Sequence, residues 1–171
     1  FIQKEKVAEA FYNLNRKGFN ISITFVGEGL GKQQKEFYKR IKKLDPEGKF
    51  LFQIQHTNHL ELPNILKKMD VFVFASSCEN MPNTLLEGMA SGLPIVCSNR
   101  GPMPEVLKDG GIYFDPENVS EFEDVLVQLI RNEELRLQIT SKSKEYAKEY
   151  GWKRCSKETF DFIIETFFNE C

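Results

Sequence analysis

The chain has 171 residues, a length that predicts one domain large enough to bury its own hydrophobic core. Its 23 basic and 25 acidic residues are well mixed and give a net charge of -2, which excludes a basic nucleic-acid-binding surface. No apolar run approaches the roughly 20 residues of a membrane-spanning helix.

Helical and strand patterns alternate along the chain. Val7, Ala10, Phe11 and Leu14 recur at helical spacing before the first strand. Five short apolar segments are predicted strands, at residues 21–26, 49–54, 70–76, 93–98 and 111–114. A helix is predicted over 83–91, and further helices over most of 118–169. Strands that are apolar throughout are buried on both faces, and short helical connections between them imply parallel pairing.

The predicted fold class is therefore α/β, a Rossmann-like, doubly wound parallel sheet with a helical C-terminal segment. The sheet has five visible strands, and a truncated sixth strand is left open. Ser120 and Glu123 fit a capping box at the start of a helix near residue 120.

The cysteines and histidines of the chain are not expected to form a metal site. The four cysteines (Cys78, Cys97, Cys155 and Cys171) lack C-x-x-C spacing and are predicted to be reduced thiols. His56 and His59 have no nearby triad of acids or cysteines, so local hydrogen bonding in a loop is favoured over a metal site.

The stretch "CENMPNTLLEGMASGLPIVCSN" places an acid on each side of a predicted helix start. Ligands of doubly wound sheets bind outside the carboxyl ends of the strands, where this loop lies. The amino end of a helix can receive a diphosphate, and a carboxylate can accept hydrogen bonds from vicinal sugar hydroxyls. Glu79 and Glu87 are thus candidates for binding a nucleoside diphosphate sugar. The alternatives are a solvated loop acid at Glu79 and a Thr84–Glu87 capping box.

A longer segment, "VFVFASSCENMPNTLLEGMASGLPIVCSNRGPMPEVLKDGGIYFDPEN", resembles the donor-binding domain of family-4 glycosyltransferases, which are retaining enzymes of the GT-B fold. Glu79 and Glu87 match the E-x7-E motif of that family. The resemblance implies that residues 1–171 are a single, C-terminal nucleotide-sugar-binding domain. It also implies an N-terminal acceptor domain outside this chain, whose first residue is Phe1 rather than Met.

The resemblance implies roles for particular residues. Glu87 is expected to accept from the ribose hydroxyls, and Glu79 is the expected catalytic residue beside the donor sugar. The other implied donor-binding groups are the amides of Asn83, Thr84 and Leu85 and the loop residues Gly27 and Gly29, all near the diphosphate, and Gln55 and His56 beside the base.

The chain departs from the family pattern at several positions. Gly88 stands where the family usually has alanine, and His56 stands near a position that is often glycine. The Arg/Lys pair that neutralises the diphosphate in these enzymes is not recognisable, although Lys4 or Lys6 is a candidate for the lysine. A site without these cations would bind donor poorly.

The function that the resemblance implies is transfer of a sugar, with retention, from a UDP- or GDP-sugar to a saccharide or lipid-linked acceptor. It implies bacterial surface polysaccharide or glycolipid synthesis, in the cytoplasm or at the inner face of the membrane, with peripheral membrane association allowed. No cofactor, metal or nucleic acid is expected, and the isolated chain is expected to bind nucleotide weakly and transfer no sugar. The apolar side chains of residues 160–168 are expected to pack partly on the N-terminal domain.

Two other functions are alternatives to the transferase. Half of a sugar-nucleotide epimerase has the same fold and would be favoured by a basic pair and catalytic acids outside this chain. A non-catalytic, flavodoxin-like interaction domain is the alternative from another class. A phosphorylatable receiver needs clustered aspartates after its first strand, and the sequence shows none.

Overall fold

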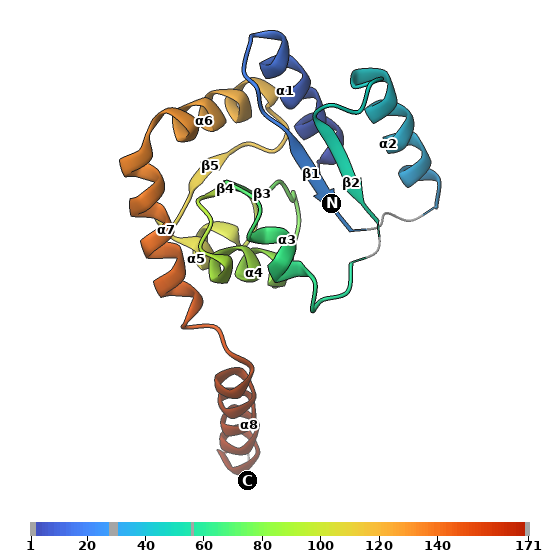
Figure 1. Cartoon of the computed structure of the whole chain (residues 1–171). Helices are drawn as coiled ribbons and strands as arrows, with labels where there is room; N and C mark the ends of the chain where they lie inside the picture. Colours follow the sequence, from blue (N-terminus) through green and yellow to red (C-terminus); the bar gives the residue numbers. More distant parts are fainter. Residues whose placement is uncertain (1–2, 28–30, 56, 170–171) are drawn as a thin grey trace.

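The structure is a computed structural model that describes residues 3–27, 31–55 and 57–169 and has the predicted α/β architecture (Figure 1). The strands are β1 (Ile23–Val26), β2 (Leu51–Ile54), β3 (Phe72–Phe74), β4 (Ile95–Ser98) and β5 (Ile112–Phe114). The helices are α1 (Lys4–Arg16), α2 (Gly31–Leu44), α3 (Leu62–Leu66), α4 (Asn83–Ser91), α5 (Met103–Leu107), α6 (Val119–Arg131), α7 (Glu133–Ala147) and α8 (Trp152–Asn169). Each predicted strand is confirmed, and the helix predicted over 83–91 has those bounds.

All strand pairs are parallel, as predicted, and they form two hydrogen-bonded groups. β1 pairs with β2, with Ile23 opposite Leu51, and β4 lies between β3 and β5. Within the described residues no ladder joins the two groups. The backbone N–H of Gln3 donates to the carbonyl of Ala75, just beyond β3, at 2.9 Å. One hydrophobic core nevertheless runs across both groups, because Phe25 of β1 and Val96 of β4 belong to the same buried cluster.

Helices cover both faces of the sheet (Figure 1). α1, α2 and α6 pack on one face, where the ring of Phe122 lies 4.7 Å from that of Phe114. α4 and α5 pack on the other face over a second cluster that includes Leu85 and Cys97. Burial raises the pKa of the Cys97 thiol to about 12, so this side chain is an uncharged core residue at neutral pH. α7 joins the layers by packing on α4, α5 and α6.

Helix α6 begins differently from the prediction. Its N-cap is Asn118, whose side-chain oxygen accepts from the Glu121 N–H at 3.2 Å. The predicted Ser120–Glu123 capping box is therefore wrong. Glu123 is buried instead, and it accepts from Lys17 at 2.5 Å and from Asn13 at 2.8 Å. Its carboxylate joins α6 to α1, which lies more than a hundred residues earlier in the chain.

The turn before β2 is organised by one buried carboxylate, Asp45, which is 4% exposed. Asp45 Oδ1 accepts from the Lys49 N–H at 2.9 Å. Asp45 Oδ2 accepts from the N–H groups of Phe50 and Leu51, both at 2.8 Å. Burial by itself raises the pKa of the Asp45 carboxyl, but the N–H donors of residues 48–51 outweigh burial and lower it.

Replacing Asp45 by alanine leaves these N–H donors, of which that of Leu51 is buried, without their acceptor and is expected to reduce the free energy of unfolding by about 2–4 kcal/mol. Because the folded-state pKa of Asp45 is lowered, its stabilisation is present above the unfolded-state value near 4 and is lost as pH falls below it. Urea unfolding at pH 7 and pH 3 measures this, and the difference from wild type should shrink at pH 3. Glu47→Gln, in the same turn but at an exposed ion pair with Lys49, should change the free energy of unfolding much less, because solvent screens the pair. Equal losses in the two variants would contradict the account.

The last helix, α8, stands apart from the α/β body (Figure 1). Residues 151–168 are all exposed. Its exposed large apolar side chains are Trp152, Phe160, Phe162, Ile163, Ile164, Phe167 and Phe168. Of the helices in the described ranges, none combines the length and apolar character needed to cross a membrane.

Candidate functional site

The candidate site is built around the amino end of α4, at the carboxyl end of β3. The N-cap of α4 is Pro82, whose side chain makes no capping hydrogen bond. Thr84 is the second helical residue rather than the cap, so the Thr84–Glu87 capping box does not form. Glu87 therefore has no capping role, and its carboxylate lies one turn into the helix on an accessible face. At the other end, Gly92 adopts φ 76°, a left-handed conformation that ends the helix.

The three amides predicted to meet a diphosphate differ in availability. The Asn83 N–H donates to Met81 O and the Leu85 N–H donates to Pro82 O, both at 2.9 Å. The Thr84 N–H has no such acceptor in the described part of the chain. Thr84 is thus the backbone donor that this helix end can offer directly, aided by the positive end of the helix dipole.

A groove of about 330 Å³ lies between α3 and α4, and Glu87 is at its edge. Its lining residues are His59, Leu62, Pro63, Leu66, Lys67, Glu87, Ala90 and Ser91. The Glu87 side chain is 31% exposed, and its Oε1 lies 3.4 Å from Nδ1 of His59. The groove thus combines aliphatic walls with a carboxylate, an imidazole and an ammonium group. Sequence reasoning did not place His59 and Lys67 at this groove, because no local pattern indicates a contact between α4 and the turn before α3.

The loops after β1 and β2 account for the other predicted donor-binding residues. Gly27 has φ 109° and its N–H donates to Ile54 O at 3.0 Å, so this turn needs glycine and lies against the end of β2. The Gln55 amide donates to the hydroxyl of Tyr38 on α2, and Gln55 is not among the residues that line the groove. Gly29 and His56, also predicted for this site, lie outside the described residues.

Glu79 is half-buried in the loop between β3 and α4. Its carbonyl oxygen lies 3.9 Å from the position that a Cβ on Gly101 would occupy, so this loop meets the turn after β4. In that turn Arg100 pairs with Asp115, which follows β5, at 2.9 Å. The Glu117 N–H and the Arg100 guanidinium lower the pKa of Asp115. The loops at the ends of β3, β4 and β5 are thus joined, although Glu79 does not line the α3–α4 groove.

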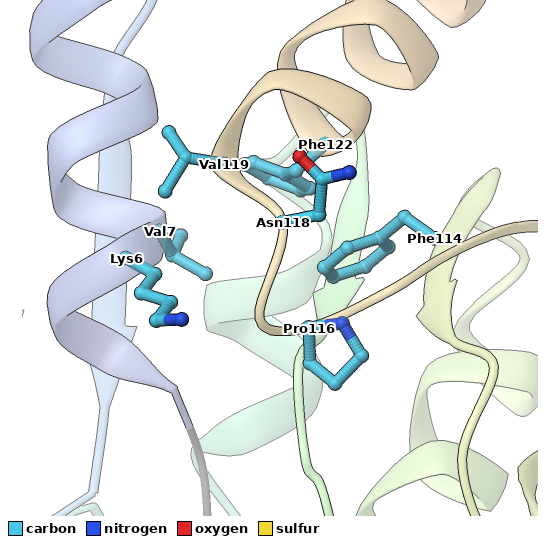
Figure 2. A pocket seen from close by; sticks show the side chains of 7 residues that line it. All are labelled: Lys6, Val7, Phe114, Pro116, Asn118, Val119 and Phe122. Carbon is cyan, nitrogen blue, oxygen red and sulfur yellow. The ribbon is translucent and has the colours of Figure 1, made fainter.

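The two lysines considered for the diphosphate have other partners. The Lys6 ammonium donates to the Glu117 carbonyl at 2.7 Å. Figure 2 shows Lys6 beside Val7 of α1, facing Phe114, Pro116 and the start of α6. The space enclosed there does not admit a water molecule. Lys4 lies over the ring of Phe37 at 5.8 Å, and burial lowers its pKa. In the described residues no group of three or more His, Cys, Asp or Glu side chains could hold a metal ion.

Gly88 lets α4 approach the sheet closely. A Cβ at this position would lie 2.5 Å from ring atoms of Phe72 on β3, well inside any real carbon–carbon contact. The phenylalanine ring thus occupies the space that the alanine usual in the family would need. This pair sets the distance between β3 and the helix that carries Glu87.

Substituting Gly88 by alanine is expected to lower the free energy of unfolding by about 1–2 kcal/mol, since overpacking outweighs the gain in helix propensity. Phe72→Leu should remove the collision, so the double variant Phe72→Leu/Gly88→Ala should be more stable than the sum of the two single changes indicates. Chemical denaturation of the three variants measures this coupling. Additive effects would show that the ring and the helix do not collide.

Comparison with known proteins agrees with this architecture. The family model described as glycosyl transferases group 1 matches residues 4–146. The O-antigen chain mannosyltransferase B of Escherichia coli is 31% identical over 101 residues, which are 59% of this chain and 26% of that protein. The chain spans 26% to 29% of the length of the first three curated relatives it matches.

Solved structures show the same fold at low identity. Sucrose-phosphate synthase from Thermosynechococcus elongatus superposes with a TM-score of 0.82 at 16% identity, covering 97% of this chain and 42% of that one. HepE from Anabaena, solved in complex with UDP and glucose, superposes with a TM-score of 0.80 at 18% identity, covering 92% of this chain and 43% of that one. The matched family model covers most of the chain, including every strand and the candidate site. The chain therefore belongs to the group 1 glycosyltransferases, with the fold of the GT-B class.

Proposed function

We propose that this chain is the donor-binding domain of a retaining glycosyltransferase that uses a nucleoside diphosphate sugar. The observation that carries the proposal is the placement of Glu87. It lies one turn into α4, has no capping role, and presents a 31% exposed carboxylate at the edge of a groove of about 330 Å³. A carboxylate accepts two hydrogen bonds from the vicinal hydroxyls of a ribose, and the nearby Thr84 N–H suits the diphosphate.

Uridine is supported as the base by the HepE structure, which contains UDP, and guanosine stays an alternative. A role in bacterial surface polysaccharide or glycolipid synthesis is supported by the name of the Escherichia coli relative, an O-antigen chain mannosyltransferase. The proposed compartment is the cytoplasm, with the acceptor at the inner face of the membrane. This matches the proposal that the cysteines are reduced thiols.

The proposed reaction is same-face substitution at the anomeric carbon. The acceptor hydroxyl oxygen forms a bond to this carbon while the bond to the phosphate oxygen breaks, and the departing diphosphate takes the hydroxyl proton. Glu79 contacts the donor sugar and orients it, and the amino end of α4 stabilises the charge that develops on the diphosphate. The step needs neither a protein nucleophile nor a metal.

The proposal places the acceptor on an N-terminal domain in a longer protein. Helix α8 supports this arrangement, because it stands apart from the α/β body (Figure 1) and its large apolar side chains are exposed. A group of exposed large apolar side chains on one helix is typical of an interface. We propose that α8 packs on the acceptor domain and holds the two halves together around the donor.

Product stereochemistry tests the reaction. The intact enzyme is supplied with UDP-glucose or GDP-mannose, both α-linked, and the new linkage is assigned by proton NMR. An α-linked product is expected. A β-linked product would contradict the retaining mechanism, and the epimerised nucleotide sugar without transfer would favour the epimerase alternative.

A further inference from the structure

The groove between α3 and α4 contains an ionisable side chain to which the proposed reaction gives no role. His59 lies in the turn after β2, and its Nδ1 is 3.4 Å from Glu87 Oε1. Asn58 holds this turn. Its side-chain oxygen accepts from the Leu60 N–H at 3.1 Å, and its backbone carbonyl accepts from the Glu61 N–H at 2.8 Å. The backbone therefore keeps His59 beside α4, although its side chain is 80% exposed.

The contact matters because Glu87 must present its carboxylate to a diol in one orientation. A glutamate side chain samples several rotamers and loses that freedom when it binds a ligand. A cation beside Oε1 restricts the carboxylate before the ligand arrives. Each carboxylate oxygen has two lone pairs, so Oε1 can still accept from a hydroxyl while it contacts His59. Restricting a binding group in advance increases affinity.

We propose that protonated His59 is a positioning residue, which orients the Glu87 carboxylate for the donor ribose and so strengthens nucleotide binding. This rests on the function proposed above. Imidazole side chains change charge between about pH 5 and 8, and only the protonated form makes an ion pair. Donor affinity is therefore highest at the acid end of this range and falls as the pH rises through it. Because the His59–Glu87 pair is solvent-exposed, the dissociation constant of the donor changes by only about three- to fivefold.

The other charged groups of the groove do not produce the same dependence. The titratable and charged side chains that line it are His59 from the turn, Lys67 from α3 and Glu87 from α4. A lysine ammonium keeps its charge throughout this pH range and contributes a constant attraction. The same pH dependence could have a second route, or cause, in which the His59 cation attracts the diphosphate directly. The two routes differ in one respect, because only positioning requires the Glu87 carboxylate.

The experiment measures dissociation constants of UDP-glucose and GDP-mannose by calorimetry at pH 5.5, 6.5 and 8.0. The diphosphate of these sugars is a diester that does not titrate in this range. Wild type is expected to bind one of them about three- to fivefold more tightly at pH 5.5 than at pH 8.0. His59→Gln should show no pH dependence, with the affinity of wild type at pH 8.0. Lys67→Gln is the matched control and should keep the dependence.

Glu87→Gln separates the two routes, since it keeps His59 and removes the carboxylate. Loss of the pH dependence in this variant supports positioning, whereas its persistence shows direct attraction to the diphosphate and overturns the role given to His59. A pH-independent wild type, or a dependence that survives in His59→Gln, overturns this inference while leaving the proposed function in place. If neither sugar nucleotide binds wild type at any pH, both the proposed function and the role of His59 fall.

Discussion

Glu87→Ala is expected to raise the dissociation constant of UDP or GDP by about 30- to 100-fold. A carboxylate facing a vicinal diol makes two charge-assisted hydrogen bonds of about 1.5–3 kcal/mol each, but both depend on one side chain, so their energies do not add in full. A loss of about 2–3 kcal/mol corresponds to this range. Calorimetric titration of the wild type and the variant measures it directly.

The loss of affinity in Glu87→Ala should depend on the two ribose hydroxyls of the ligand. Wild type should prefer a nucleoside diphosphate to its 2′,3′-dideoxy analogue by a similar factor, and Glu87→Ala should show no preference. Glu134→Ala is the matched control, because Glu134 is an exposed acid in the first turn of α7, away from the groove. A preference for ribose that survives in Glu87→Ala would remove Glu87 from the binding site.

Glu79→Gln is expected to lower kcat/KM for sugar transfer by the intact enzyme about 10- to 100-fold, with less than a threefold change in affinity for the free nucleoside diphosphate. The expected loss is that of one or two charge-assisted hydrogen bonds to the sugar as it departs from the diphosphate. The nucleotide itself does not contact Glu79 in the proposed site, so its affinity should be preserved. Initial rates at several donor concentrations, together with binding of the diphosphate alone, separate the two quantities.

Asp70→Asn provides the control for Glu79, because Asp70 is an exposed acid at the amino end of β3, opposite the proposed site. It should leave transfer unchanged. Loss of nucleotide affinity in Glu79→Gln, equal to the loss in rate, would assign Glu79 to the nucleotide rather than to the sugar.

The fold follows from local sequence patterns. The strands are segments of three or four mainly apolar residues, and β4 is buried along its whole length. Such segments identify strands of a sheet covered on both faces whatever their partners. The bounds of α4 were also predictable, because the helix ends at Gly92 and begins after Pro82.

Side-chain contacts between distant segments could not be predicted in the same way. The Thr84–Glu87 spacing is typical of a capping box, yet the N-cap is Pro82, two residues before Thr84, so Thr84 lies inside the helix and does not cap it. Glu123 likewise fits a capping box and is instead a buried partner of Lys17. The contact between His59 and Glu87 depends on how α3 packs on α4, which no local pattern encodes.

The structure explains one of the departures from the family pattern. Gly88 is explained by the ring of Phe72, which fills the place of the missing methyl group. Lys4 lies over the ring of Phe37 and Lys6 donates to the carbonyl of Glu117, so each lysine has a partner within the chain. A diphosphate-binding role for either lysine stays a prediction.

The central physical claim is that the diphosphate of a sugar nucleotide is received by the first turn of α4. Backbone amide NMR during titration with UDP and with GDP tests it most directly. The largest shift changes are expected at Asn83, Thr84 and Leu85, with Glu87 next, and residues of α6 should stay unperturbed. Saturable binding that leaves these four amides unshifted would contradict the claim.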